Sequence, residues 1–208
     1  MSSRDEFTDI ANYFNDAFAR HGATARGLDW NGEETQRISL EQCSKILAPD
    51  ETGFSLIDLG CGFGPYYAFL KARGYEADYV GYDLSRPMIE TAKRIYANDP
   101  KARFEVGDRA LEQADYAVAS GIFNLRLDRS DADWLAFITD TIDHLAASAR
   151  RGVAFNCLTR YSDPPKMRPD LYYADPCQLF DYCKRKHSRD VALLHDYGKY
   201  EFTILLRF

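Results

Sequence analysis

The stretch that most constrains the fold is SLIDLGCGFGPYY, from Ser55 to Tyr67. An apolar run leads into Asp58, and three glycines then stand on alternate positions from Gly60 to Gly64. The run predicts a short buried strand over 54–59, and the residues after it predict a helix over 64–73. Glycine lets a backbone adopt positive φ and approach a ligand closely, because it has no Cβ atom. The stretch therefore predicts a strand, a turn and a helix, and the turn either binds a ligand or is simply tight.

Strands and helices continue to alternate along the chain. The other expected strands cover 77–83, 102–106, 115–120, 152–158, 190–196 and 199–208. Tyr197-Gly198 is a hairpin signal between the last two. Two amphipathic helices are expected ahead of the first strand, over about 5–19 and 32–47, with a loop over 50–53. Three later helices each open on a capping residue, which is Ser85, Ser130 or Asp175.

This alternation predicts the α/β class. We expect a doubly wound, seven-stranded, mainly parallel sheet with helices on both faces and one antiparallel strand from the closing hairpin. Residues 1–208 are then a single domain, in which 1–50 form an N-terminal helical cap and 51–208 form the core. In such sheets ligands bind beyond the carboxyl ends of the strands, near the first strand.

The charge balance and the cysteines narrow the class of protein. The chain of 208 residues has a net charge of −6, so long-range attraction to nucleic acid or to an anionic membrane is not expected. Its five cysteines form no CxxC pair and predict reduced thiols in a cytoplasmic protein. We expect no secretory signal and no membrane span, because no apolar run is long enough. The oligomeric state, monomer or homodimer, stays open.

The glycine turn does not match the common phosphate-binding motifs. A dinucleotide fingerprint starting at Gly60 would need a third glycine where this chain has Pro65. A P-loop would need Gly-Lys followed by Ser or Thr, which is missing here. Asp58 would repel a pyrophosphate, whereas it can hold the turn through its amides or attract an ammonium group. A nicotinamide-dependent oxidoreductase is therefore a distant alternative.

Two further aspartates follow later strands. Asp83 ends the strand over 77–83, where a carboxylate can accept hydrogen bonds from both hydroxyls of a ribose. Asp108 follows the third strand in Gly107-Asp108 and can accept from an adenine amino group. Each also has a simpler interpretation, as a helix cap or a turn residue. Together with the turn they indicate a site for an adenosyl group.

Three segments in order, LIDLGCGFG, VGYDLSRPMIETA and FEVGD, make the chain resemble the class I S-adenosylmethionine-dependent methyltransferases. The resemblance covers about residues 54–208. It implies the Rossmann-like methyltransferase fold, S-adenosyl-L-methionine as cofactor and S-adenosyl-L-homocysteine as product. It also implies cofactor contacts from the glycine turn, from the ends of the next three strands and from the helix after the second. These residues are Gly60, Cys61, Gly62, Asp83, Leu84, Met88, Asp108, Arg109 and Ser120, in addition to Asp58.

The segment after the fourth strand argues against several kinds of methyltransferase. It reads Ser120-Gly-Ile-Phe-Asn124, which lacks the Pro-Pro-aromatic motif of base methyltransferases. It lacks the clustered Asp and Asn of catechol-type magnesium enzymes and the paired glutamates of arginine methyltransferases. We therefore expect metal-independent methyl transfer by direct displacement to an oxygen, nitrogen or carboxylate of a small molecule. A peptide or protein acceptor and a non-catalytic cofactor-binding protein remain alternatives.

The acceptor site is expected to lie between the cap, the turn after the fourth strand and the irregular segment 159–174. Trp30 and Gln36 are expected to fold over the cofactor, and Arg37 is an alternative to Gln36 as the partner of its carboxylate. Trp30 could equally just pack the cap onto the sheet. The candidate acceptor-binding residues are Asn124, Tyr161, Tyr172, Tyr173 and His195. Asn156 is expected to have a specific partner, because its strand is otherwise apolar. No residue stands out as a catalytic base.

Overall fold

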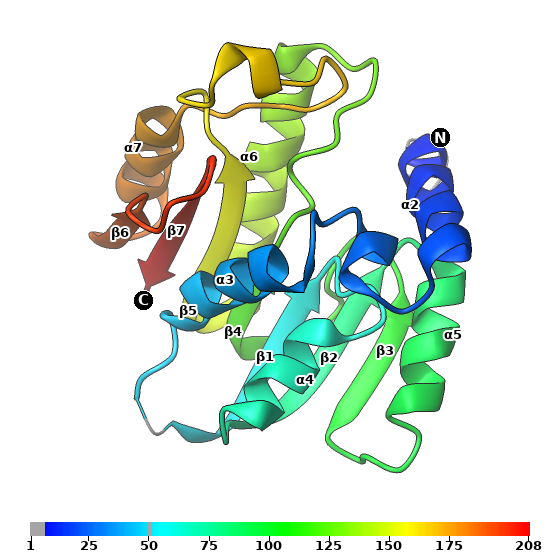
Figure 1. The fold of residues 1–208 in the computed structure, drawn as a ribbon. Helices are drawn as coiled ribbons and strands as arrows, with labels where there is room; N and C mark the ends of the chain where they lie inside the picture. Colours follow the sequence, from blue (N-terminus) through cyan, green and yellow to red (C-terminus); the bar gives the residue numbers. More distant parts are fainter. Residues whose placement is uncertain (1–6, 50) are drawn as a thin grey trace.

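The computed structural model describes residues 7–49 and 51–208 (Figure 1). Seven strands form one sheet in the order β3-β2-β1-β4-β5-β7-β6. Strands β1 to β5 run parallel, and β7 is antiparallel to both of its neighbours, β5 and β6. The predicted fold class is therefore confirmed. The strands are Thr52–Leu59 (β1), Glu76–Asp83 (β2), Ala102–Val106 (β3), Ala114–Ala119 (β4), Ala149–Leu158 (β5), Asp190–Leu194 (β6) and Glu201–Arg207 (β7).

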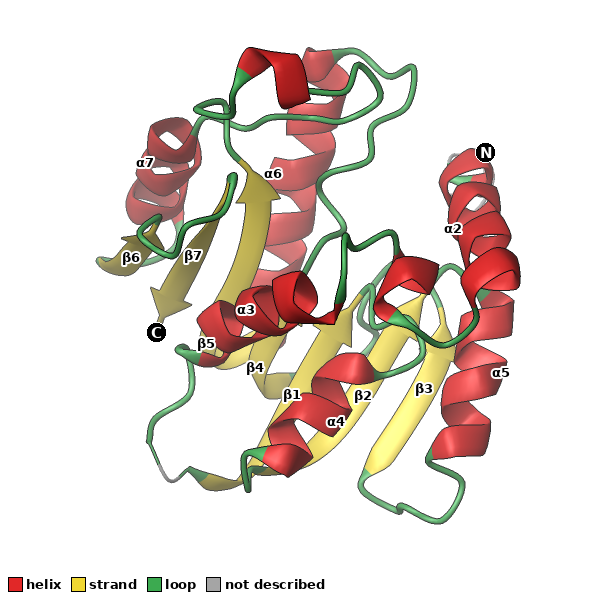
Figure 2. Cartoon of the chain, viewed as in Figure 1, coloured by secondary structure: helices red, strands yellow, loops and turns green. Residues whose placement is uncertain are grey.

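Helices cover both faces of this sheet, as Figure 2 shows. Helices α3, α4 and α5 supply buried side chains to one face, while α6 and α7 pack on the other. Helix α2 and the short helix η1 come first in the described chain and lie over the carboxyl end of the sheet (Figure 1). The helices are Thr8–His21 (α2), Ala25–Leu28 (η1), Glu33–Ser44 (α3), Pro65–Ala72 (α4), Arg86–Ile95 (α5), Asp131–Ser148 (α6), Pro164–Lys166 (η2) and Pro176–Lys186 (α7).

The predicted caps open their helices. The Ser85 hydroxyl accepts from the backbone N–H of Met88 at the start of α5, and Ser130 caps α6 through Asp133 in the same way. Asp175 accepts from two amides of α7. Each cap satisfies a donor that has no partner inside its helix, which fixes where the helix begins.

Some boundaries differ from those expected. Strand β1 already begins at Thr52, within the predicted loop 50–53, and its pairing with β2 shifts register at Gly53. Strand β5 begins at Ala149 rather than 152, and its second and third residues are two exposed arginines that precede the apolar run. The hairpin strands are shorter than expected and leave the six-residue segment 195–200 between them. Residue 50 and the first residues of the predicted helix 5–19, up to 6, lie outside the described residues.

No helix in the described part of the chain is both long and apolar enough to cross a membrane.

Candidate functional site

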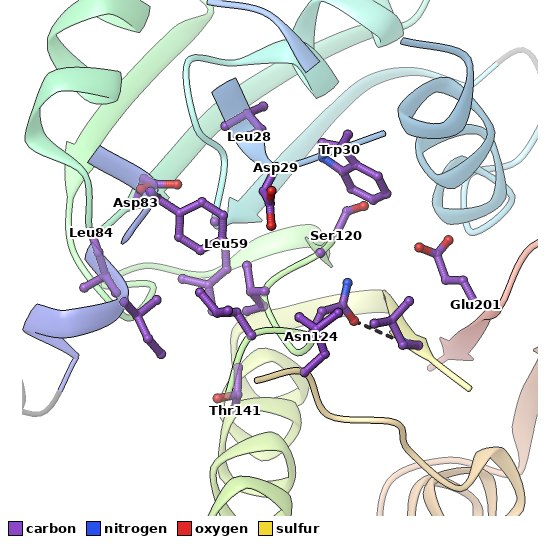
Figure 3. Close-up of a pocket in the computed structure, with 18 of the residues that line it drawn as sticks. Leu28, Asp29, Trp30, Leu59, Asp83, Leu84, Ser120, Asn124, Thr141 and Glu201 are labelled. Atoms are coloured by element: carbon purple, nitrogen blue, oxygen red, sulfur yellow. Dashed lines mark hydrogen bonds between the residues drawn. The ribbon is translucent and has the colours of Figure 1, made fainter. Parts of the chain in front are cut away.

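A cavity of about 1050 Å³ lies at the carboxyl end of the parallel strands (Figure 3). Its floor comes from the residues that end β1, β2 and β4 or directly follow them, and its roof from α2, η1 and α3. Ligand pockets typically measure about 300–1,000 Å³, so this one has room for more than one small molecule. The position is the one where open α/β sheets bind ligands.

The glycine turn forms part of the floor and is held by the neighbouring strand. The backbone N–H groups of Gly60 and Cys61 both donate to the carbonyl of Tyr82, at 2.7 and 3.0 Å. Gly60 has a φ of 78°, and a Cβ atom built there would lie 2.0 Å from Cγ2 of Ile122. A side chain at this position would therefore be strained and would also collide with the loop after β4. The turn fits a bound molecule that approaches the backbone closely.

Asp83 connects the turn to the end of β2. One carboxylate oxygen accepts from the Gly62 amide and the other from the Ser85 amide, both at 2.8 Å. Burial raises the pKa of Asp83, and the two amides oppose that rise. Each carboxylate oxygen keeps a further lone pair. Asp83 lines the cavity, so it can accept from two more donors, such as neighbouring hydroxyls of a sugar.

Asp58 had two possible roles, to hold the turn through its amides or to attract an ammonium group, and the first belongs to Asp83 instead. Its Oδ2 accepts from the Tyr79 hydroxyl at 2.5 Å, and the carboxylate that holds the turn is Asp83. Burial, together with the nearby charge of Asp83, raises the pKa of Asp58 to about 7. Because Asp58 lines the cavity, a cationic group nearby would favour its ionised form.

The side of the cavity beyond β2 and β3 is lined by the residues expected around an adenine. These are Leu84, Met88, Asp108 and Arg109. Arg109 pairs with Asp140 of α6 at 2.8 Å, so it bridges to the helix on the other face of the sheet. Met88 is buried, whereas Leu84 points into the cavity in Figure 3.

Asn156 has the specific partners expected of a polar group in an apolar strand. Its Nδ2 donates to Ser120 Oγ at 3.0 Å, and its Oδ1 accepts from the Gly121 amide at 2.7 Å. Gly121 has a φ of 86°, and a Cβ there would lie 3.0 Å from Cζ2 of Trp30. The turn after β4 is thus fixed from below by Asn156 and covered from above by Trp30.

The cap contributes Trp30 and Gln36 to the cavity wall. Arg37 instead forms ion pairs with Glu34 and Glu41 on the exposed side of α3. Of Gln36 and Arg37, the two alternative partners for a ligand carboxylate, Gln36 therefore lines the cavity and Arg37 does not.

Two of the five candidate acceptor-binding residues line the cavity, Asn124 and Tyr173. The Asn124 Oδ1 accepts from the Leu158 amide at 3.0 Å, and the Tyr173 hydroxyl accepts from the Arg168 amide at 2.9 Å. The described residues that line the cavity do not include Tyr161, Tyr172 or His195, nor Gly62 among the cofactor candidates.

The three acceptor candidates and Gly62 do not line the cavity, each for a different structural reason. Leu171 forms an isolated β-bridge with Leu125, so the chain is extended there and successive side chains point to opposite sides. Leu171 and Tyr173 therefore face the cavity, whereas Tyr172 packs into the core. Tyr161 is 64% exposed, and its ring lies 6.0 Å from that of His195. Gly62 acts through its backbone, because its N–H binds Asp83.

Sequence reasoning missed Lys199 and Glu201, which both line the cavity. Glu201 is 1% exposed at the start of β7, between Tyr200 and Phe202. An acidic residue in an apolar strand was the available signal, and it is the same signal that marked Asn156. Within the described residues, no group of three or more His, Cys, Asp or Glu side chains could hold a metal ion.

Sequence comparisons point to one kind of enzyme. A family model described as "Methyltransferase domain" matches residues 56–148. Rv1506c of Mycobacterium tuberculosis, assigned as a methyltransferase, is 56% identical over 154 residues, which are 74% of this chain and 93% of that protein. A trans-aconitate 2-methyltransferase of Methylobacterium radiotolerans is 36% identical over 87 residues, which cover 39% of this chain and 32% of the relative.

Solved structures show the same fold. Magnesium protoporphyrin IX methyltransferase from Synechocystis PCC 6803, with bound S-adenosylhomocysteine, superposes with a TM-score of 0.69 at 15% identity. The match covers 96% of this chain and 98% of that one. Human N-acetylserotonin methyltransferase, in complex with S-adenosylmethionine, has a TM-score of 0.59 at 14% identity, over 84% of this chain and 54% of its own.

Proposed function

The chain belongs to the class I S-adenosylmethionine-dependent methyltransferases, and we propose that it methylates a small molecule without a metal ion. Proteins of this family use S-adenosylmethionine, which supplies an electrophilic methyl group on a sulfonium. What the chain itself must do is bind the cofactor, exclude water and align an acceptor atom with that methyl group. We further propose that 1–50 act as a cap on a core over 51–208, within one domain.

The residues present fit the cofactor. Asp83 has free acceptor sites for the ribose hydroxyls, and Asp108 with Arg109 borders the space for the adenine. Leu84 and Met88 offer apolar contact for the ring. These residues are our proposed nucleoside contacts.

The methionine part would lie along the glycine turn, past Gly60 and Cys61 and towards Ser120. Asp58 is the proposed partner of its ammonium group, because it is the acidic side chain beneath the turn. Trp30 and Gln36 would cover this part from the cap. An acidic and aromatic lining suits a ligand that carries a sulfonium and an ammonium.

The observation that favours a small acceptor is the enclosure of the remaining space. Beyond Ser120 the cavity continues between Trp30, Asn124 and Tyr173, and residues of α2 also line it. Phe7 of the cap contacts Phe137 of α6 with ring centroids 4.9 Å apart, and Asp9 pairs with Arg129 at 2.9 Å. A roof held to α6 and to the loop before it leaves space for a metabolite rather than for a folded macromolecule. The trans-aconitate methyltransferase among the relatives supports a small acceptor.

The test combines cofactor binding with transfer. Isothermal titration should show micromolar binding of S-adenosylmethionine and S-adenosylhomocysteine, whereas NADH should give no heat. With methyl-labelled cofactor and a metabolite extract, label should enter the small-molecule fraction and persist in the presence of EDTA. Absence of binding to both cofactor forms contradicts the proposal. Label in protein alone assigns a protein acceptor, and binding without any transfer assigns a non-catalytic role.

A further inference from the structure

A buried lysine–glutamate pair stands in the wall of the cavity, apart from the proposed cofactor contacts. Lys199 Nζ lies 3.3 Å from both carboxylate oxygens of Glu201, and the exposed fractions of the two side chains are 15% and 1%. Lys199 also donates to the carbonyl of Thr35, at 2.9 Å, and to the hydroxyl of Ser39. All three ammonium protons therefore have acceptors within the protein. The lysine is fixed in place, and its charge is matched to Glu201.

Glu201 keeps unused acceptor capacity. Its Oε1 accepts from the Ser39 hydroxyl at 2.7 Å and from the Tyr197 hydroxyl at 3.4 Å. Among the described residues, its Oε2 contacts only Lys199, at 3.3 Å. A carboxylate oxygen has two lone pairs, and Glu201 lines the cavity. This oxygen can accept a hydrogen bond, or a proton, from a molecule in the cavity.

The pair lies across β5 from the end of β4, where the reacting methyl group is proposed to be. Trp30 spans the two places, since a Cβ on Gly121 would lie 3.0 Å from its ring and the Lys199 ammonium lies 4.8 Å from its ring centroid. In the sheet, Glu201 pairs with Leu158, two residues after Asn156, which binds Ser120. Figure 3 shows Glu201 across the cavity from Asp83, with Ser120 and Trp30 between them.

We propose that Glu201 is the general base of the transfer and that the acceptor is a hydroxyl group on a small aromatic molecule. The proposal rests on the methyltransferase function proposed above. As the bond between acceptor oxygen and methyl carbon forms, the carbon–sulfur bond breaks and its electron pair stays on sulfur. The proton of the hydroxyl moves to Oε2 of Glu201. Trp30, Tyr173 and Tyr200 supply aromatic contacts for the ring of the acceptor. Lys199 is a positioning residue, which holds the carboxylate and favours its charged form.

The surroundings of Glu201 define how its protonation should respond to pH. Burial raises its pKa, and Lys199 opposes that rise. Besides Lys199 and Tyr197 in its own hairpin, Cys43 of α3 and Cys157 of β5 interact with it, and burial raises the pKa of both thiols, so they stay neutral. A base must be unprotonated, so the transfer rate should fall as the pH drops through the raised pKa of Glu201. Removing the Lys199 charge should move this fall to higher pH.

Binding is tested first, with phenol as the probe and with S-adenosylhomocysteine saturating. Glutamate labelled with ¹³C at the side-chain carboxyl should give one signal that is lost in Glu201→Gln, and phenol should shift that signal. Glu201→Gln should bind S-adenosylhomocysteine within threefold of the wild type. A tenfold loss would assign the pair to the cofactor instead and overturn the proposal, as would failure of phenol to bind the loaded wild-type protein. Loss of cofactor binding by the wild type itself would contradict the proposed function rather than this inference.

Transfer is tested next, with phenol compared to benzoate, which is already unprotonated and needs no base. Glu201→Gln should slow methylation of phenol by at least about 100-fold. It should not slow any transfer to benzoate, because the variant removes the repulsion between two carboxylates. Lys199→Met should move the acidic limb of the phenol rate profile to higher pH. Thr203→Val, which removes a neutral partner of Tyr197 outside the cavity, should leave that limb in place. A phenol rate within threefold of wild type in Glu201→Gln, or no phenol methylation by the wild type, overturns the proposal.

Discussion

At the scale of single residues, the glycine turn owes its shape to a partner outside the motif. Asp83 accepts from the Gly62 amide, while Asp58, inside the motif, accepts from Tyr79. The sequence predicts where the glycines and both aspartates lie in the fold, because each belongs to a local strand–turn unit or to the end of a strand. The sequence does not predict that Asp83 rather than Asp58 binds the turn, because this depends on how β1 and β2 are paired. In the observed register Asp58 lies beside Gly81, and Tyr79 is within reach of its carboxylate.

Replacing Asp83 by Ala should weaken binding of S-adenosylhomocysteine by about 2–4 kcal/mol, or roughly 30- to 1000-fold. The variant loses two charge-assisted hydrogen bonds to ligand hydroxyls and also frees the Gly62 amide. Isothermal titration measures the change. Asp78→Ala, on an exposed position of the same strand, is the matched control and should bind as the wild type does. Equal affinity for both variants would mean that Asp83 only holds the turn.

At the scale of elements, capping residues and apolar periodicity predicted where most helices and strands lie. Strand β5 shows the limit of that reasoning. Its first residues include Arg150 and Arg151, which are typical of a loop but pair with Asp115 and Glu51 near the starts of β4 and β1. The acceptor side was harder still. Whether Tyr172 or Tyr173 meets the cavity depends on which alternate residue of an extended segment faces inward, and no local pattern fixes that.

Helix α7 offers a prediction at this scale. Asp175→Ala removes the cap of α7 and the partner of Arg160, and the free energy of unfolding should fall by about 1 kcal/mol. Burial alone would raise the pKa of Asp175, but Arg160 and the helix amides outweigh it and lower the pKa. The stabilisation should therefore be present at neutral pH and be lost as the pH falls through that lowered pKa. Urea unfolding measures it.

Asp181→Ala, in the exposed ion pair with Arg185 on the same helix, serves as the control for Asp175. Exposed pairs of this kind contribute little, so its unfolding midpoint should barely move. An equal loss in both variants would show that the cap is not the source of the effect.

At the scale of the whole molecule, the cavity gathers acidic groups that the fold buries. Burial raises the pKa values of Asp58, Asp83 and Glu201. In the folded protein these groups bind protons at pH values where the unfolded chain has already released them. The free energy of unfolding should therefore decrease as the pH rises through their folded pKa values, opposite to the behaviour of ion-paired surface carboxylates.

Asp58→Asn isolates one of these contributions. With a folded pKa of about 7, Asp58 should make the ligand-free wild type lose about 1 kcal/mol of stability between pH 6 and pH 8. The asparagine keeps an acceptor for the Tyr79 hydroxyl but does not titrate, so the variant should lose less over the same interval. Urea unfolding at the two pH values provides the comparison. Parallel losses in both proteins would show that Asp58 stays ionised throughout.

The Ser39–Glu201 hydrogen bond joins positions 162 residues apart. A ribosome makes the amino-terminal part first, so Trp30 and α3 exist for most of translation without β7 beneath them. The proposed cofactor contacts of the core, from Asp58 to Ser120, are complete well before that. A chain interrupted before the final hairpin would thus carry these cofactor contacts without the wall proposed to hold the acceptor. The wall proposed to hold the acceptor is therefore completed only once the final hairpin has been made.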